Sequence, residues 1–234
     1  PQKVLNNEVF NKYLIAKKKI NNISAIFNID DLPKIDIILI SHNHFDHLDK
    51  QTIVFLLKRQ PNIKFFVPLG LSKILRSFGA KKIIEIDWWQ SVEYEGIEIQ
   101  ATQVQHWSRR SFFDRNKTLW SGWMLRWNDF SFYFAGDSGY SSDFVRTAER
   151  FGNPTLAAIP IGSYQPRAFM KAAHMCPEEA VRVFRDLGAK YALGIHWGTF
   201  KLSLESMDEP PRRLIKCLKK AGISEKKFKC LQHG

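Results

Sequence analysis

The sequence predicts a single mixed α/β domain. From Leu32 onward, short apolar runs rich in β-branched residues alternate with amphipathic segments, and turn residues separate them. The chain has 234 residues, of which 44% are hydrophobic and 25% charged, so it can bury a sizeable core without disulfides. This composition excludes a collagen, a coiled coil and a disordered chain, and the longest apolar runs are far too short to cross a membrane.

The expected strands are short apolar segments bounded by turn residues. They cover 35–40, 63–67, 82–86, 97–104, 119–127, 130–135, 156–161 and 191–195. Helices are expected over 50–60, 72–78, 143–151, 177–187 and 211–221. Asp49 fits the N-cap of the first helix, and Pro177 fits the first position of the fourth. Residues 1–31 have weak periodicity and form a poorly specified segment, so the expected domain covers 32–234.

The charge and the cysteines limit the partners and the compartment. The net charge of +12 predicts attraction to nucleic acid, anionic lipid or phosphorylated metabolites, or merely a soluble surface. Cys176, Cys217 and Cys230 are too few for a disulfide framework or a thiolate zinc site, which favours a reducing compartment. No signal peptide or transmembrane segment is visible, so a cytoplasmic or peripheral-membrane location is expected. The chain begins at Pro1, which leaves a trimmed sequence open.

Three of the seven histidines fall within six residues, in the pattern His-x-His-x-Asp-His. They are His42, His44 and His47, and Asp46 lies among them. Imidazole suits zinc, copper, iron and nickel, and a carboxylate can complete such a site. A tight loop could point His42 and His44 at one ion, and Asp46 and His47 at a second. The alternative is a polar turn whose histidines cap backbone groups.

Three further polar residues follow the ends of expected strands, namely His106, Asp137 and His196. Sites in α/β sheets assemble at that edge, so these side chains should converge with the histidine loop. Separately, each could be a core histidine or a turn. Together they give two ligand sets in which Asp137 bridges. The first ion would take His42, His44, His106 and Asp137. The second would take Asp46, His47, Asp137 and His196.

These motifs resemble the metallo-β-lactamase fold superfamily, and within it the subgroup of N-acyl-phosphatidylethanolamine-hydrolysing phospholipase D. The matching segments are LPKID (32–36), ISHNHFDHLD (40–49), HWSRR (106–110), FAGDSGY (134–140), AAIPIG (157–162), YQPRAFM (164–170), PEEA (177–180), IHWGTF (195–200) and EPP (209–211). The resemblance implies an αββα sandwich. Residues 1–30 do not look like the family's first strands, so the N-terminal half-sheet is expected to be missing, shortened or degenerate. Cys176 replaces the family's acidic N-cap, at a small cost in helix stability.

The resemblance also implies an activity. Two zinc ions, or other divalent metals, would share a water and lower its pKa, and the resulting hydroxide would attack a phosphodiester. The products would be N-acylethanolamine and phosphatidic acid. Asp46 or a metal-bound water would protonate the leaving oxygen, and Asp137 would bridge the ions. His174 either contacts the metals or substrate, or caps the helix at Pro177.

The remaining expectations concern substrate contacts and partners. Tyr164, Arg167 and Arg109 could bind the phosphate or head group, or could be structural or solvated. Four clustered aromatic residues are expected in the core, although exposed they would suit an acyl chain or membrane: Trp88, Trp89, Phe112 and Phe113. The helix over 211–221 could lie on anionic lipid, but its apolar face is expected to pack on the domain.

Two other functions remain open. One is a metal-dependent hydrolase of the same fold acting on a soluble lactone or sugar phosphate. The other is a non-catalytic or nucleic-acid-binding protein, which the absence of an aromatic RNA-binding motif disfavours. A homodimer is left open.

Overall fold

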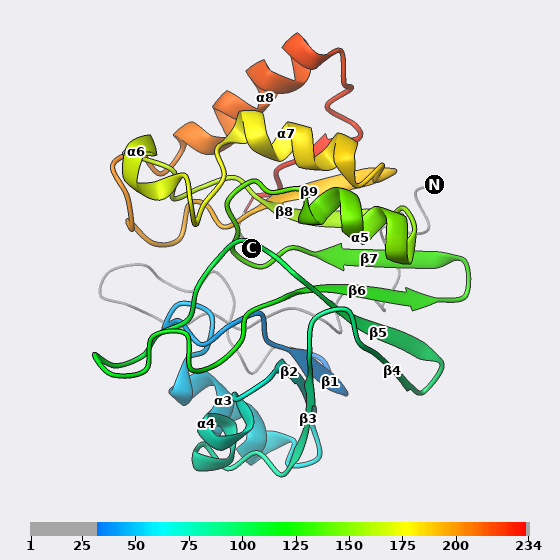
Figure 1. Ribbon diagram of the computed structural model, residues 1–234, viewed down its shortest axis with the longest axis vertical. Helices are drawn as coiled ribbons and strands as arrows, with labels where there is room; N and C mark the ends of the chain where they lie inside the picture. Colours follow the sequence, from blue (N-terminus) through cyan, green and yellow to red (C-terminus); the bar gives the residue numbers. More distant parts are fainter. Residues whose placement is uncertain (1–31, 233–234) are drawn as a thin grey trace. The chain divides into compact units, whose positions relative to one another are not determined.

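The computed structural model describes residues 32–232 in two compact units. The first unit comprises residues 32–87 and 108–119, and the second comprises 88–107 and 120–232. Each unit has its own sheet and its own hydrophobic core (Figure 1). The expectation of a missing, shortened or degenerate N-terminal half-sheet concerns residues 1–30, which lie outside the described residues.

The first unit is a three-stranded parallel sheet with two helices. The strands are β1 (Ile37–Leu39), β2 (Lys64–Pro68) and β3 (Lys82–Ile86), in that spatial order. The helices are α3 (Lys50–Arg59) and α4 (Ser72–Ser77). The core forms because the central strand buries Phe65, Phe66 and Val67 completely. A parallel central strand is covered on both faces, which explains why its sequence is a continuous apolar run.

The second unit contains a seven-stranded mixed sheet of order β10-β9-β8-β7-β6-β5-β4. Its strands are β4 (Ser91–Tyr94), β5 (Ile97–Thr102), β6 (Gly122–Trp127), β7 (Phe130–Phe134), β8 (Leu156–Pro160), β9 (Tyr191–Ile195) and β10 (Phe228–Lys229). Its helices are α5 (Asp143–Phe151), α6 (Arg167–Met170), α7 (Pro177–Asp186) and α8 (Glu209–Ala221). Helix α7 packs on β8 and on α8, so the helices build up outward from the sheet (Figure 1).

Strand direction in this sheet sets where functional side chains can gather. Strands β5 and β6 pair antiparallel, as do β6 and β7, so β5 and β7 run in the same direction. Strands β7, β8 and β9 pair parallel. The carboxyl ends of β5, β7, β8 and β9 therefore share one edge of the sheet, and the sequence predicts functional residues after three of these strands, β5, β7 and β9.

The expected elements match closely, with three additions. The sequence did not predict β4, α6 or β10. These segments have four, four and two residues, too short to show a clear period. Helix α8 begins two residues earlier than expected, and Ile215 is 46% exposed instead of packing with Leu214 and Leu218. Over residues 32–232, no helix is both long enough and apolar enough to span a bilayer.

The expected burial of the aromatic cluster is wrong for two of its members. Phe112 is 87% exposed and Phe113 is 86% exposed, whereas Trp88 and Trp89 are partly buried. The indole nitrogen of Trp88 donates to the Trp120 carbonyl at 2.5 Å. The two phenylalanines occupy a turn between polar residues, where apolar composition alone does not ensure burial.

Candidate metal centre

The histidine loop of the first unit gathers its three imidazoles directly after β1. Nε2 of His42 lies 2.8 Å from Nδ1 of His44, and the ring centroids of His42 and His47 lie 4.2 Å apart. The backbone N–H groups of His47 and Leu48 both donate to the His44 carbonyl, which closes the turn. Nε2 of His47 lies 3.3 Å from a carboxylate oxygen of Asp46. Four of the predicted ligands therefore meet within one loop.

Both ends of this loop are held by side chains. The Asp49 carboxylate accepts hydrogen bonds from the backbone N–H and the hydroxyl of Thr52, which caps α3 as predicted. The guanidinium of Arg110 donates to the carbonyls of Asn43 and Leu48, at 2.8 and 2.7 Å. Burial lowers the pKa of Arg110, and the carboxylates of Asp49 and Asp114 act in the opposite direction. The two hydrogen bonds of Arg110, hereafter the brace of the histidine loop, were not predicted from the sequence, because no spacing rule links residues more than 60 positions apart.

The second unit brings together the three residues predicted at strand ends. The carboxylate of Asp137, after β7, has one imidazole near each oxygen. Nε2 of His196, after β9, lies 3.1 Å from Oδ1, and Nε2 of His106 lies 3.8 Å from Oδ2. His106 and Asp137 are buried. These three side chains form the strand-end set.

The hydrogen bonding of His106 suits a metal ligand. Its Nδ1 lies 3.0 Å from the carbonyl oxygen of Ala173, which can only accept, so Nδ1 carries the proton. In the neutral ring, Nε2 then keeps its lone pair, and Nε2 is the atom that faces Asp137. Backbone carbonyls fix the tautomer of metal-binding histidines in this way. The donor chemistry of imidazole nitrogens and carboxylates therefore fits zinc and similar divalent metals.

His174 lies within the same cluster. Its ring stacks on that of His196, with centroids 5.5 Å apart, and meets the His106 ring edge-on at 5.3 Å. One ligand atom each from His106, Asp137 and His174 lies within 4.8 Å of the others. The structure thus places His174 beside the strand-end set.

The backbone around His196 is closely packed. His196 has a φ of +59°, in the left-handed region that non-glycine residues rarely adopt. A Cβ added at Gly162 would lie 2.2 Å from the carbonyl oxygen of His196. Glycine is required there because the segment after β8 and the segment after β9 approach too closely for any side chain.

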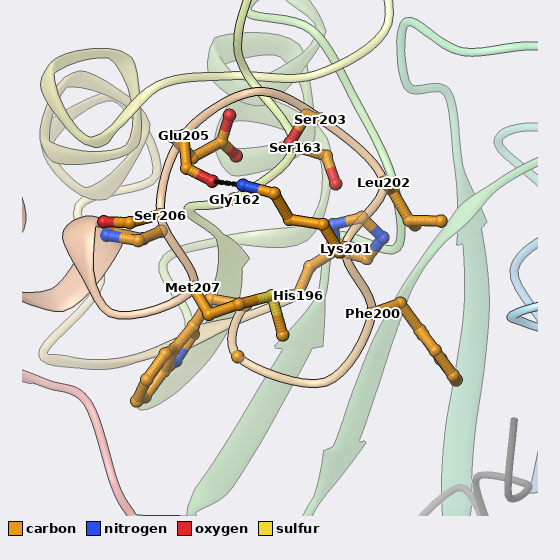
Figure 2. Close-up of a pocket in the computed structure, with 13 residues that line it drawn as sticks. Gly162, Ser163, His196, Phe200, Lys201, Leu202, Ser203, Glu205, Ser206 and Met207 are labelled. Atoms are coloured by element: carbon orange, nitrogen blue, oxygen red, sulfur yellow. Dashed lines mark hydrogen bonds between the residues drawn. The ribbon is translucent and has the colours of Figure 1, made fainter. Parts of the chain in front are cut away.

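A hollow beside His196 is covered by the loop that follows β9 (Figure 2). Its lining includes Gly162, Ser163, His196 and Trp197 together with residues 200–203 and 205–207. The Glu205 carboxylate accepts hydrogen bonds from the backbone N–H groups of Tyr164 and Gln165, at 3.1 and 2.9 Å. The ammonium of Lys201 donates to the Glu205 carbonyl within the loop (Figure 2). Sequence reasoning did not single out Glu205.

Tyr164 and Arg167 are predicted either to bind the phosphate or to be structural, and their contacts fit the structural alternative. Tyr164 is fully buried, and its hydroxyl donates to Glu209 at 2.6 Å. Arg167 donates to the Glu179 carboxylate and to the His174 carbonyl. Both side chains hold the fold in this structure. Arg109 donates to the Ser111 carbonyl and keeps a partly exposed position.

The start of α7 also involves Glu179. Its carboxylate accepts a hydrogen bond from the backbone N–H of Cys176 at 3.1 Å. Burial raises the pKa of the Cys176 thiol to about 11, so this thiol is a structural group. The described cysteines, Cys176, Cys217 and Cys230, are all free, as the sequence predicts.

Comparison with known proteins decides the family. The model of the family described as "Beta-lactamase superfamily domain" matches residues 15–197. The chain belongs to this family. Two relatives are 38% identical. N-acyl-phosphatidylethanolamine-hydrolyzing phospholipase D 1 of Caenorhabditis elegans aligns with 80% of this chain and 56% of its own length. N-acyl-phosphatidylethanolamine-hydrolyzing phospholipase D, mitochondrial, of Saccharomyces cerevisiae aligns with 91% of this chain and 47% of its own length.

A likeness to a solved structure supports the fold. Igni18, a metallo hydrolase from Ignicoccus hospitalis, superposes with a TM-score of 0.67 at 21% identity, over 88% of this chain and 79% of its own. The predicted metallo-β-lactamase fold and the predicted subgroup are therefore confirmed. The chain spans about half the length of the two curated relatives described above. Together these likenesses show the family and support its fold.

Proposed function

We propose that the protein is a zinc-dependent phosphodiesterase that cleaves N-acyl-phosphatidylethanolamine to N-acylethanolamine and phosphatidic acid. The observation that carries the proposal is the strand-end set, in which one buried carboxylate faces two imidazoles and a carbonyl fixes the tautomer of His106. The names of the two 38% identical relatives supply the substrate class.

We further propose that the histidine loop and the strand-end set serve one dinuclear centre. The support is the sequence motif and the family, since each set alone has too few donors to hold two ions. The ligands would be those predicted above: His42, His44, Asp46, His47, His106, Asp137 and His196. Bound divalent cations lower the pKa of water and polarise phosphoryl oxygens.

The reaction consumes one water. An oxygen–phosphorus bond forms to water as the bond between phosphorus and the ethanolamine oxygen breaks, and a proton passes to that leaving oxygen. Asp46 or a metal-bound water is proposed to pass to the leaving oxygen the proton that the attacking water gives up; the Asp46 carboxylate lies beside His47 in the loop. His174 is proposed to orient the imidazoles of His106 and His196, against which it packs. Arg109 is proposed to bind the anionic head group.

The test combines metal analysis with product identification. The purified full chain should contain about two zinc ions, and it should release N-acylethanolamine and phosphatidic acid from N-acyl-phosphatidylethanolamine in mixed micelles. Chelation should abolish activity and lower the melting temperature, because the bound metal stabilises only the folded state. His44→Ala should lose metal and activity together.

His233→Ala is the matched control, because His233 is not among the proposed ligands, and it should retain both properties. A metal-free chain would contradict the proposal. So would hydrolysis of lactones or sugar phosphates without any phospholipid cleavage, which would instead assign the protein to the soluble-substrate hydrolases of the same fold.

A further inference from the structure

We propose that residues 108–118, hereafter the aromatic loop, bind the surface of an anionic lipid bilayer by inserting Phe112 and Phe113 into its interface. The inference goes beyond the proposed function and does not depend on it, because membrane binding can be measured without turnover. It rests on the exposure, the order and the charge of this one loop.

The exposure of the two rings is the first observation. Phe112 and Phe113 are 87% and 86% exposed, and they are consecutive in the chain. Scattered exposed apolar residues are ordinary on protein surfaces, but two consecutive phenylalanines left almost wholly in water favour a partner that buries them. A bilayer interface removes such rings from water without requiring a complementary protein groove.

The loop is also ordered by its own hydrogen bonds. The Asp114 carboxylate accepts hydrogen bonds from the backbone N–H groups of Arg110 and Ser111, at 3.0 and 2.7 Å. Further along, Asn116 N–H donates to the Ser108 carbonyl at 2.8 Å, and the Ser108 hydroxyl donates to the Thr118 carbonyl at 2.6 Å. The tip is therefore presented in a defined conformation, so binding costs little additional ordering.

The charge of the aromatic loop indicates which kind of surface it binds. Apart from Arg110, whose guanidinium donates to the histidine loop, the aromatic loop contains three cations, Arg109, Arg115 and Lys117, and one acid, Asp114, giving 3 − 1 = +2. The Arg109 guanidinium lies 5.2 Å from the centre of the Phe112 ring. Cations around an apolar tip suit a surface with anionic head groups over hydrocarbon. Single-stranded nucleic acid would in addition need a groove that follows its backbone.

The experiment measures flotation of the full chain with phosphatidylcholine vesicles that contain about 30 mol% phosphatidylserine. This fraction gives the vesicles a surface charge similar to that of an anionic membrane leaflet. The wild type should bind these vesicles more tightly than pure phosphatidylcholine vesicles. The double variant Phe112→Ser/Phe113→Ser should lower the partition coefficient roughly 30- to 100-fold, because two rings no longer leave water. Its thermal unfolding should be unchanged, since both side chains are exposed.

Two further variants sharpen the test. Phe169→Ser is the matched control, because Phe169 is also 81% exposed but lies in α6 of the second unit, and it should change binding by less than about twofold. Arg115→Gln/Lys117→Gln should weaken binding to the anionic vesicles about 20- to 30-fold, and added salt should reduce the difference. Arg110 is left intact because it braces the histidine loop.

Four results would overturn the proposal. The first is that the wild-type chain floats with neither kind of vesicle, and the second is that the double variant binds as tightly as the wild type. The third is that Phe169→Ser lowers the partition coefficient as much as the double variant does. The fourth is that the wild type is a dimer and the double variant a monomer. The last result, measured by sedimentation, would make the tip a contact between two copies of the chain. Binding to single-stranded RNA in place of vesicles would assign the rings to base stacking.

Discussion

The histidine loop and the strand-end set contain the same kinds of side chain but are assembled differently. The histidine loop takes four candidate ligands from six consecutive residues after one strand, and its imidazoles contact one another across two and five positions. The strand-end set takes His106, Asp137 and His196 from the ends of three strands, across 196 − 106 = 90 positions. The first set depends on a local turn, and the second depends on the whole order of a seven-stranded sheet.

This difference determines how each set can be damaged. A local loop loses its geometry when its braces are removed, whereas a set built on strand ends tolerates surface changes but is sensitive at its shared carboxylate. Packed, buried groups also leave little room for rearrangement. The two sets should therefore respond unequally to substitutions of comparable chemistry.

The largest effect is expected from Asp137→Asn. The amide keeps the shape of the side chain but removes the negative charge and one acceptor that face His106 and His196. If the cations supply several kcal/mol of transition-state stabilisation, the value of kcat/KM should fall roughly a thousandfold. Zinc content and kcat/KM on N-acyl-phosphatidylethanolamine are the measurements.

The control for that variant is Asp129→Asn, an exposed aspartate in the turn between β6 and β7. It should behave as the wild type. Full zinc content and activity in Asp137→Asn would show that the shared carboxylate does not unite the strand-end set.

A smaller effect is expected when the brace of the histidine loop is removed. Arg110→Ala loses two charge-assisted hydrogen bonds, to the carbonyls of Asn43 and Leu48. The free energy of unfolding should fall by about 2–4 kcal/mol. Zinc affinity, measured by competition with a chromophoric chelator, should fall about 10- to 100-fold, as it does when groups that orient metal ligands are removed.

Arg109→Ala is the matched comparison, since the Arg109 side chain donates only within its own loop, to Ser111. It should keep the zinc affinity of the wild type. Equal zinc affinities in Arg110→Ala and Arg109→Ala would mean that the loop holds its geometry without the brace, and the contrast between the two sets would disappear.

The same contrast explains what the sequence could predict. His-x-His-x-Asp-His is visible because its members are neighbours, and strand ends are visible because β-branched runs stop at polar residues. The carbonyl of Ala173, the guanidinium of Arg110 and the carboxylate of Glu205 could not be predicted, because each acts on a partner 40 or more positions away through a contact that no local pattern encodes. The expected burial of Phe112 and Phe113 was wrong for a related reason: composition gives the preference for burial, but the tertiary structure decides it.

The smallest effect is expected at the loop beside His196 and depends on pH. Burial alone would raise the pKa of Glu205, but hydrogen bonds from Ser203 and from backbone N–H groups, including those of Gln165 and Tyr164, outweigh it and hold the pKa below its ordinary value. A depressed carboxylate pKa stabilises the folded state above the unfolded value of about 4.3, and this contribution is lost as the pH falls through the folded pKa. Glu205→Gln should therefore be less stable than the wild type at pH 7, by about 1–3 kcal/mol.

The difference in unfolding free energy should stay constant above about pH 5 and close below about pH 4, as the wild-type carboxylate becomes protonated. Urea unfolding of both proteins across this range measures it, with Glu225→Gln at an exposed position as the control. A difference in unfolding free energy that persists unchanged at low pH would show that the loop is held by packing and not by the carboxylate.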